Sequence, residues 1–248
     1  LFDQPVEEDT KYLVEHKRYF TDFSFHRQKL LLHRASMKAY ADTFDVEYVE
    51  FNQDVLDIFE RHDTIRMYDP VDHKLREQFE TMAEKTGTEL IFEDNPGFIA
   101  SMKLNRSYFA NHKYFQLNYY KMMRKEHEVL VEDGEPAGGK WSFDPENRKK
   151  MPESMERPEI PEFGSEYVEE AREYVENNFT ENPGKMDGFF WPVTREQALQ
   201  NLEDFLENRL EKFGDYQDAI DSDLKFGFHS LLSSSINIGL LTPEEVIE

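Results

Sequence analysis

The chain has 248 residues, of which 38% are hydrophobic and 14% aromatic, so it can bury the core of one large or two ordinary domains and is not disordered throughout. It contains no cysteine, which excludes disulfides, zinc–thiolate sites and thiol nucleophiles. No apolar run approaches the roughly 20 residues that span a bilayer, and no signal-peptide pattern opens the sequence. We therefore expect a soluble cytoplasmic protein. The net charge of −23 argues against nonspecific nucleic-acid binding over the whole surface.

The first part of the chain alternates helical and strand patterns. Residues 25–44 have helical periodicity, with Leu30, Leu31, Met37 and Tyr40 on one stripe. Strand patterns at 46–51, 64–69 and 88–94 are separated by helical patterns at 54–62 and 73–87, the second ending at Gly87. This alternation is typical of βαβ units, so we predict parallel strands with covering helices from about Asp45 to Glu93.

The middle of the chain differs from the first part in composition. Residues 107–130 are predicted to be helical and combine six Tyr and Phe rings with Lys113, Lys121, Arg124 and Lys125. Such a texture can bind nucleic acid, but packing of an aromatic helix between two domains is the favoured interpretation. Residues 132–164 lack hydrophobic periodicity and are rich in Gly, Pro and charge, which predicts a long connector.

The last part of the chain is predicted to be entirely helical. Helical patterns cover 165–179 and 194–214, the second with Thr194 and Gln197 as a capping box and Gly214 as its stop. Thr242–Glu245 is the signature of a further helix start. The predicted architecture is an α/β domain, a long linker and an all-α domain. Because so few residues follow Thr242, we interpret the chain as a piece of a longer protein.

Few residues carry recognisable chemistry. The sequence contains no GxSxG, Walker A, GxGxxG or HExxH pattern. His26 and His33 lie seven apart, unlike a metal pair, and are interpreted as surface or interface residues. A loop that brings His229 and Ser230 to the start of an apolar helix offers backbone N–H groups and hydroxyls together, a combination that binds phosphate. By itself this pattern is weak, since a serine there usually only caps the helix.

The segment at His229 and several others occur in this chain in the same order as similar segments of a known family. The run His229-Ser230-Leu231-Leu232-Ser233, with residues 236–241, resembles the segment of photolyases and cryptochromes in which Thr-Ser-x-Leu-Ser begins the helix holding the FAD pyrophosphate. Histidine in place of that threonine is a feature of the deoxyribodipyrimidine photolyase-related proteins, the branch with the bacterial iron–sulfur cryptochromes and (6-4) photolyases. Further segments that are similar to this branch are 26–42, 138–152, 189–199 and 213–233.

This resemblance implies a division of the chain into three parts. Residues 1–105 would form a Rossmann-like α/β antenna domain that lacks its first strand, 106–165 a connecting helix and long interdomain linker, and 166–248 the start of a helical FAD-binding domain. The residues implied to contact FAD are Tyr216, His229, Ser230, Leu231, Leu232 and Ser233, although Tyr216 is one residue off the usual spacing. The family's 4Fe-4S cluster would have no cysteine ligand in this chain. A lumazine-type antenna is expected from the resemblance, and the first strand, which helps to form the antenna pocket, is missing from this chain.

The implied function is that of the N-terminal part of a flavin-dependent, light-driven DNA repair photolyase, a lyase for (6-4) photoproducts. The expected partner is UV-damaged DNA. The protein is expected to be a monomer that does not associate with a membrane, and this piece alone is expected to be inactive. The alternatives are a blue-light signalling cryptochrome of the same fold and a non-enzymatic acidic helical binding protein. No catalytic residue is assigned.

The expected DNA contacts follow from uneven charge. Residues 101–150 hold ten Lys and Arg against seven Asp and Glu, whereas the rest of the chain is strongly acidic. We expect this net-positive segment to face DNA, with Lys149 and Lys150 in contact with phosphates.

Overall fold

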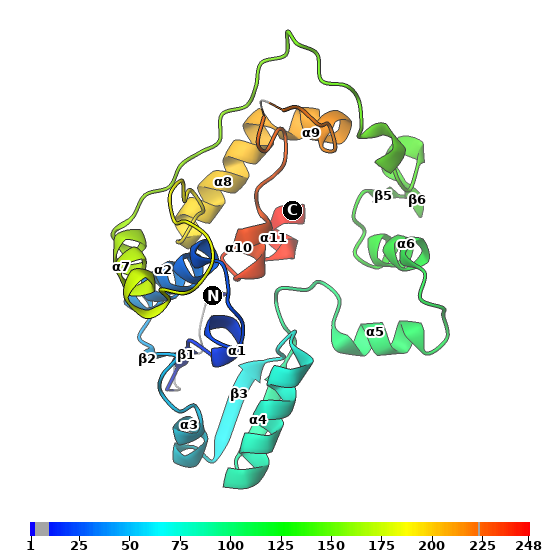
Figure 1. Cartoon of the computed structure of the whole chain (residues 1–248). Helices are drawn as coiled ribbons and strands as arrows, with labels where there is room; N and C mark the ends of the chain where they lie inside the picture. The colour runs from blue at the N-terminus through cyan, green and yellow to red at the C-terminus, as the bar shows by residue number, and fades with distance from the viewer. Residues whose placement is uncertain (3–9, 223) are drawn as a thin grey trace. The chain divides into compact units, whose positions relative to one another are not determined.

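The computed structural model describes residues 1–2, 10–222 and 224–248 (Figure 1). The strands are β1 (Tyr12–Val14), β2 (Glu47–Val49), β3 (Thr64–Tyr68), β4 (Glu89–Glu93), β5 (Val131–Glu132) and β6 (Glu135–Pro136). The α-helices are α1 (Lys17–Phe20), α2 (Arg27–Thr43), α3 (Leu56–Arg61), α4 (His73–Thr86), α5 (Met102–Phe109), α6 (Gln116–Glu126), α7 (Glu166–Asn178), α8 (Arg195–Asn208), α9 (Leu210–Tyr216), α10 (Ser233–Asn237) and α11 (Pro243–Ile247). Two short 3₁₀ turns lie at Ala137–Gly139 and Asp144–Glu146.

These elements form two compact units, and neither unit is continuous in sequence. The first unit comprises Leu1–Gly97, Glu162–Ala198 and Ser234–Thr242. The second comprises Phe98–Pro161, Leu199–Ser233 and Pro243–Glu248. The three-part division at residues 105 and 165 therefore stays a prediction about the whole protein.

The first unit contains the predicted parallel strands. β1 pairs with β2 in the register Tyr12↔Glu47, and β3 pairs with β4 in the register Thr64↔Glu89, both in parallel. The prediction for residues 45–93 is confirmed, whereas β1 was missed because Tyr12–Val14 is a short apolar run without the alternation seen around β2. Within the described ranges the two pairs are separate two-stranded sheets, so the structure is mixed α/β and mostly helical, without the single predicted sheet.

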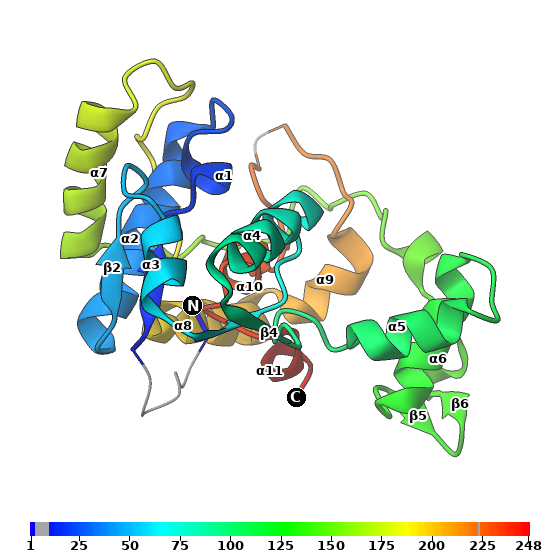
Figure 2. The same ribbon diagram turned by 90° about the horizontal axis from the view of Figure 1, so that it is seen from below.

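The core of the first unit lies between α2 and α7, which run side by side in Figures 1 and 2. Periodicity in α7 turns Val168, Ala171 and Val175 toward α2. The buried hydrophobic residues of this cluster are Phe20, Leu30, Leu31, Leu32, Ala35, Met37, Val168, Ala171, Val175, Phe179, Met186 and Val193. α7, which follows the connector and was predicted to begin the flavin domain, thus packs on α2 of the first unit.

Helix ends follow the predicted signals at Gly87, at Thr194 and at Thr242, after which α11 begins, but not at Gly214. Asp72 accepts hydrogen bonds from the N–H groups of Lys74 and Leu75 at the start of α4, and Gly87, at φ 79°, ends that helix. The Thr194 hydroxyl accepts from the N–H of Gln197, as the capping box requires. Gly214 is not a stop, since it lies inside α9. The break falls instead at Arg209, whose φ/ψ of −128°/−29° separates α8 from α9.

The second unit divides the predicted aromatic helix into two. α5 begins at the cap residue Ser101, whose hydroxyl accepts from the N–H of Leu104, and α6 begins after Phe115. Between them, Nδ1 of His112 lies 2.8 Å from the carbonyl oxygen of Tyr108, an acceptor that a continuous helix would use itself. The predicted connector contains the short hairpin of β5 and β6, and it has no helix or strand from residue 147 to 165.

Candidate phosphate-binding loop

The segment from His229 to Leu232 is a loop, not the first turn of a helix. α10 begins only at Ser233 and has five residues, and Gly239, at φ 80°, lies two residues beyond its end. Leu231 adopts a left-handed conformation, with φ 58°. The expectation that a helix starts at Ser230 is therefore wrong, and the helix dipole contributes little here because the helix is so short.

Two buried side chains hold this loop in place. Nη1 of Arg209 donates to the carbonyl oxygen of His229 at 2.8 Å, and Nδ2 of Asn201 donates to that of Leu231 at 3.1 Å. Arg209 is fully buried and also donates to Asp204 and Asn201, so its charge is compensated. These two bonds hold the carbonyl groups of the left-handed Leu231 and of His229, two residues before it, so the backbone of the loop is fixed.

Sequence reasoning missed Asn201 and Arg209, although a signal was present. Ala198, Asn201, Phe205 and Arg209 follow one another at spacings of three and four, and all four are buried. An amide and a guanidinium on the apolar stripe of a helix need partners inside the protein. The sequence therefore allowed the prediction that Asn201 and Arg209 bind the backbone of a neighbouring loop.

The loop leaves several hydrogen-bond donors available. Among the described residues, no hydrogen bond is formed by the N–H groups of Ser230, Leu231 and Leu232 or by the hydroxyls of Ser230 and Ser233. The side chains of Leu231 and Leu232 are buried, whereas Ser230 is half-buried and Ser233 exposed. Backbone and hydroxyl donors gathered on an accessible loop fit the oxygens of a phosphate group.

Tyr216 and His229 lie at the two ends of the segment that leads into this loop. Tyr216 is the last residue of α9, and its ring centroid lies 6.1 Å from that of Phe228. His229 has an exposed side chain, and its N–H donates to the carbonyl of Phe226. The contact with Phe228 brings Tyr216 near the loop, while no hydrogen bond from Tyr216 to the serines is described.

The two predicted DNA-contact lysines differ from each other. Nζ of Lys149 lies 2.7 Å from Oδ1 of Asp215, and this hydrogen bond raises the pKa of Lys149. Arg148 and Arg157 pair in the same way with Asp218 and Asp221. Lys150 is exposed, without an ion pair among the residues that the structure covers. The connector is thereby attached to the end of α9 and to the segment after it, and Lys149 is not a free cation.

Another charged cluster lies at the core of the first unit, where it joins β1, α2 and α7. Arg34, 4% exposed, donates to Glu15, Glu50 and Glu170. Tyr48 and Tyr174 donate to the two oxygens of Glu15 at 2.6 and 2.7 Å.

In this cluster, burial alone would lower the pKa of Arg34, but the hydrogen bonds to Glu170 and Glu15 outweigh burial and raise that pKa. Burial and the charge of Glu15 raise the pKa of Tyr48. Every group has a partner, so the cluster is structural.

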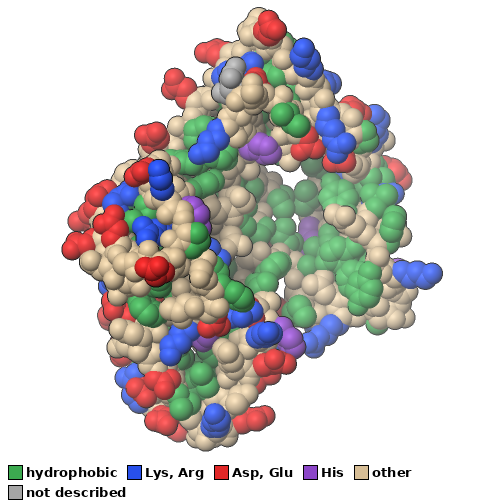
Figure 3. Space-filling model, viewed as in Figure 1, with side chains coloured by type: hydrophobic (Ala, Val, Ile, Leu, Met, Phe, Trp, Pro, Cys, Tyr) green, Lys and Arg blue, Asp and Glu red, His purple; other side chains and the backbone are tan. Residues whose placement is uncertain are grey.

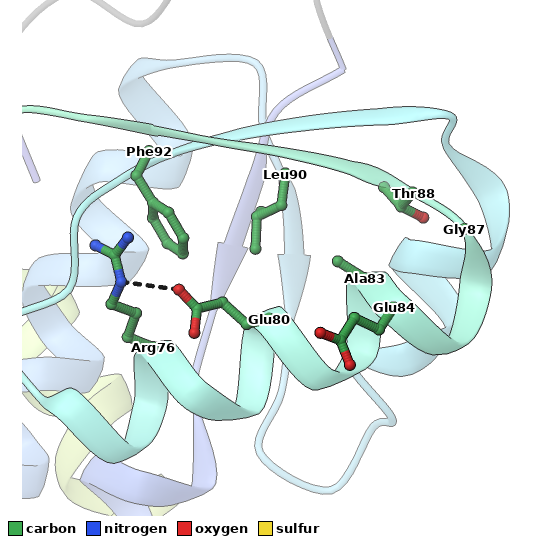
Figure 4. A pocket seen from close by; sticks show the side chains of 8 residues that line it. All are labelled: Arg76, Glu80, Ala83, Glu84, Gly87, Thr88, Leu90 and Phe92. Atoms are coloured by element: carbon green, nitrogen blue, oxygen red, sulfur yellow. Dashed lines mark hydrogen bonds and ion pairs between the residues drawn. The ribbon is translucent and has the colours of Figure 1, made fainter.

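A shallow groove of about 540 Å³ lies between α4 and β4 (Figure 4). Within the groove, Arg76 pairs with Glu80 at 3.0 Å and lies 4.0 Å over the Phe92 ring. None of the residues predicted to bind FAD or DNA lines it. The eight lining residues are Arg76, Glu80, Ala83, Glu84, Gly87, Thr88, Leu90 and Phe92.

The histidines do not form a metal site, and no three metal-ligating side chains gather within the part of the chain that is described. Nδ1 of His26 accepts from the N–H of Gln28 at the start of α2. His33 is half-buried and packs on the rings of Tyr19 and Phe20, and burial lowers its pKa to about 4. No helix among the described residues has the length and apolar character needed to cross a membrane.

Comparison with known proteins covers most of the chain, and the family model ends before this loop. The family model described as deoxyribodipyrimidine photo-lyase-related protein matches residues 1–191. A (6-4) photolyase from Agrobacterium fabrum is 33% identical over 180 residues, which are 72% of this chain and 36% of that protein. Uncharacterized protein R852 of Acanthamoeba polyphaga mimivirus is 30% identical over 167 residues, 59% of this chain and 85% of that protein. The chain thus spans about a third of the photolyase's length. It belongs to the deoxyribodipyrimidine photolyase-related family.

Proposed function

We propose that this chain forms the N-terminal part of a flavin-dependent, light-driven DNA photolyase that repairs (6-4) photoproducts. The observation that carries the proposal is the family membership, together with 33% identity to a protein named (6-4) photolyase. Because the chain corresponds to only 36% of that relative, repair activity, UV-damaged DNA as substrate and FAD as cofactor are proposals about the whole protein.

The part of this chain in the proposed function is to bind the FAD pyrophosphate. The hydroxyls of Ser230 and Ser233 and the N–H groups of Leu231 and Leu232 would donate to the phosphate oxygens, with Tyr216 and His229 beside them. Arg209 and Asn201 would keep the donors in position by binding the carbonyl groups on the other side of the loop. FAD would supply the light-driven electron transfer to the lesion.

The test is a double substitution, Ser230→Ala with Ser233→Ala, in the protein expressed from its complete reading frame. We expect the FAD content per polypeptide, measured from flavin absorbance, to fall severalfold while the far-UV circular dichroism is unchanged. The matched control is Ser107→Ala with Ser154→Ala, two exposed serines of the same unit. Full flavin retention in the first variant would show that the loop does not bind the pyrophosphate.

A signalling cryptochrome of the same fold is the alternative, and residues of this chain do not separate it from a repair enzyme. Light-dependent turnover of (6-4) and cyclobutane substrates by the flavin-loaded protein distinguishes them. Loss of (6-4) lesions only under light supports the proposal, and flavin photoreduction without repair of either lesion supports signalling. A 4Fe-4S cluster and a lumazine-type antenna stay predictions about the whole protein, and this chain offers no cysteine to the cluster.

A further inference from the structure

The segment 98–125, which contains α5 and α6, has an unusual charge for this chain. It carries six Lys and Arg and no Asp or Glu, within a protein of net charge −23. Lys103, Arg106 and Lys113 are exposed, and no ion pair is described for any of the three. Arg124 differs from them, since it is buried and donates to the carbonyls of Val129 and Trp141.

Five rings of the same segment form one continuous cluster. Tyr108 stacks on His112 at 4.2 Å and meets Tyr119 edge-on at 5.4 Å. Phe109 stacks on Tyr119 at 5.2 Å and on Tyr114 at 4.7 Å, with interplanar angles of 22° and 23°. Tyr114 is therefore the last ring of a stack.

The end of this stack is open to solvent. Tyr114 is 87% exposed, so only one of its faces is covered, and its neighbour Phe115 is 56% exposed. Hydrophobic side chains gather over this part of the second unit in Figure 3. The expectation that these aromatic residues pack between domains does not account for a stack that ends in an open ring beside unpaired cations.

We propose that the face formed by Lys103, Arg106, Lys113, Tyr114 and Phe115, here called the α5–α6 face, binds single-stranded nucleic acid. Bases continue the ring stack on the open face of Tyr114 and on Phe115, and the three cations bind the phosphates. The partner is single-stranded because only unpaired bases present their flat faces to a protein ring. It is a nucleic acid and not an acidic peptide because exposed stacking surfaces accompany the positive charge.

This site is separate from the proposed flavin loop, and it adds a contact that recognises the strand rather than the lesion. A lesion flipped out of a duplex leaves unstacked bases beside it. The α5–α6 face offers a place for such bases. The inference does not require that the flavin loop has been assigned correctly.

The experiment measures binding of a fluorescent 16-nucleotide oligo-dT and of the matching duplex by anisotropy, using the full-length protein in the dark. We expect tighter binding of the single strand. Tyr114→Ala with Phe115→Ala should weaken it about tenfold or more, since each base–ring stack contributes about 1–3 kcal/mol. The control is Phe23→Ala, because Phe23 is 56% exposed like Phe115 but lies in the first unit.

A second variant tests the cations. Lys103→Gln, Arg106→Gln and Lys113→Gln together should reduce the slope of log affinity against log salt by about 2, since each single-strand phosphate contact contributes about 0.7. The matched control is Lys74→Gln, Lys85→Gln and Lys185→Gln, exposed lysines of the first unit.

Four results would overturn the inference. The first is equal binding of single strand and duplex, and the second is unchanged affinity in the aromatic variant. The third is equally tight binding of poly-glutamate, and the fourth is absence of oligo-dT binding by the full-length protein. FAD content and photorepair are measured on the same variants, so a failure here is distinguishable from a failure of the proposed function.

Discussion

Two regions of the molecule combine aromatic rings with cations, and they do so in opposite ways. In the first unit Arg34 lies 3.8 Å over the ring of Tyr174 and is enclosed by Glu15, Glu50 and Glu170. In the segment 98–125 of the second unit the rings stack on one another, and the segment contains cations but no acidic residue. Acidic side chains complete the first region and are missing from the second.

The difference shows which feature separates structural from binding clusters. A buried guanidinium is tolerated only when carboxylates and hydroxyls take up its charge and its donors, and Arg34 fulfils this condition. A cation without such partners must remain in water or meet an anion from outside. Both regions are rich in aromatic residues, so aromatic content does not distinguish them. The number of acidic residues near the cations separates a structural cluster from a binding surface.

The largest effect is expected from Arg34→Ala. Removal of one member of a buried ionic cluster leaves Glu15 buried without its counter-charge, which costs on the order of 3–5 kcal/mol. The free energy of unfolding, measured by chemical denaturation, should fall by this amount. A loss below about 1 kcal/mol would contradict the structural role of the cluster.

Arg34→Lys is the companion variant, because it keeps the charge and is more certain to fold. Lysine cannot bond Glu15 and Glu170 through a planar fork, so we expect an intermediate loss. Arg106→Ala on the α5–α6 face is the control, and it should leave the unfolding free energy nearly unchanged.

The next effect concerns His33, which packs near the same core. Its pKa of about 4 in the folded protein lies below the ordinary value of 6.5, because burial disfavours the charged ring and Lys29 adds a repulsion. Above pH 6.5 the ring is neutral in both states. As the pH falls from 6.5 toward 4 the unfolded chain binds a proton that the folded chain does not, so stability is lost over this range, by up to about 3 kcal/mol.

The measurement compares unfolding free energies of the original chain and His33→Gln between pH 4 and 7. The stability of the original chain relative to the variant should rise with pH over this interval. A difference that does not depend on pH would mean that His33 is accessible to protons in the folded state.

The sequence predicted the local elements far better than their partners. Gly87 ends α4, and strands 64–68 and 89–93 form as expected, because helix stops and short apolar runs act over a few residues. The helical pattern at 165–179 predicted α7 but could not show that it packs on α2, more than a hundred residues earlier. The same limit applies to Arg34, whose partner Glu170 is 136 residues away.

The candidate loop shows the same division. The residue types at 229–233 pointed to phosphate donors, and the structure leaves those donors available. The predicted helix start at Ser230 was wrong because the deciding contacts come from Asn201 and Arg209, outside the motif. A left-handed leucine is not visible in a sequence, since leucine rarely adopts that conformation without tertiary support.

The smallest effect on stability is expected where the α5–α6 face is most exposed. Tyr114→Ala removes one end of the ring stack, but a side chain that is 87% exposed has little contact area to lose. Its unfolding free energy should stay within about 0.5 kcal/mol of the original, as is usual for surface positions. Tyr174→Phe is the contrasting variant, because it removes a hydrogen bond to buried Glu15 and should cost about 1–2 kcal/mol. If Tyr114→Ala were the more damaging of the two, the exposed stack would be part of the folded core, and the contrast between the two regions would fail.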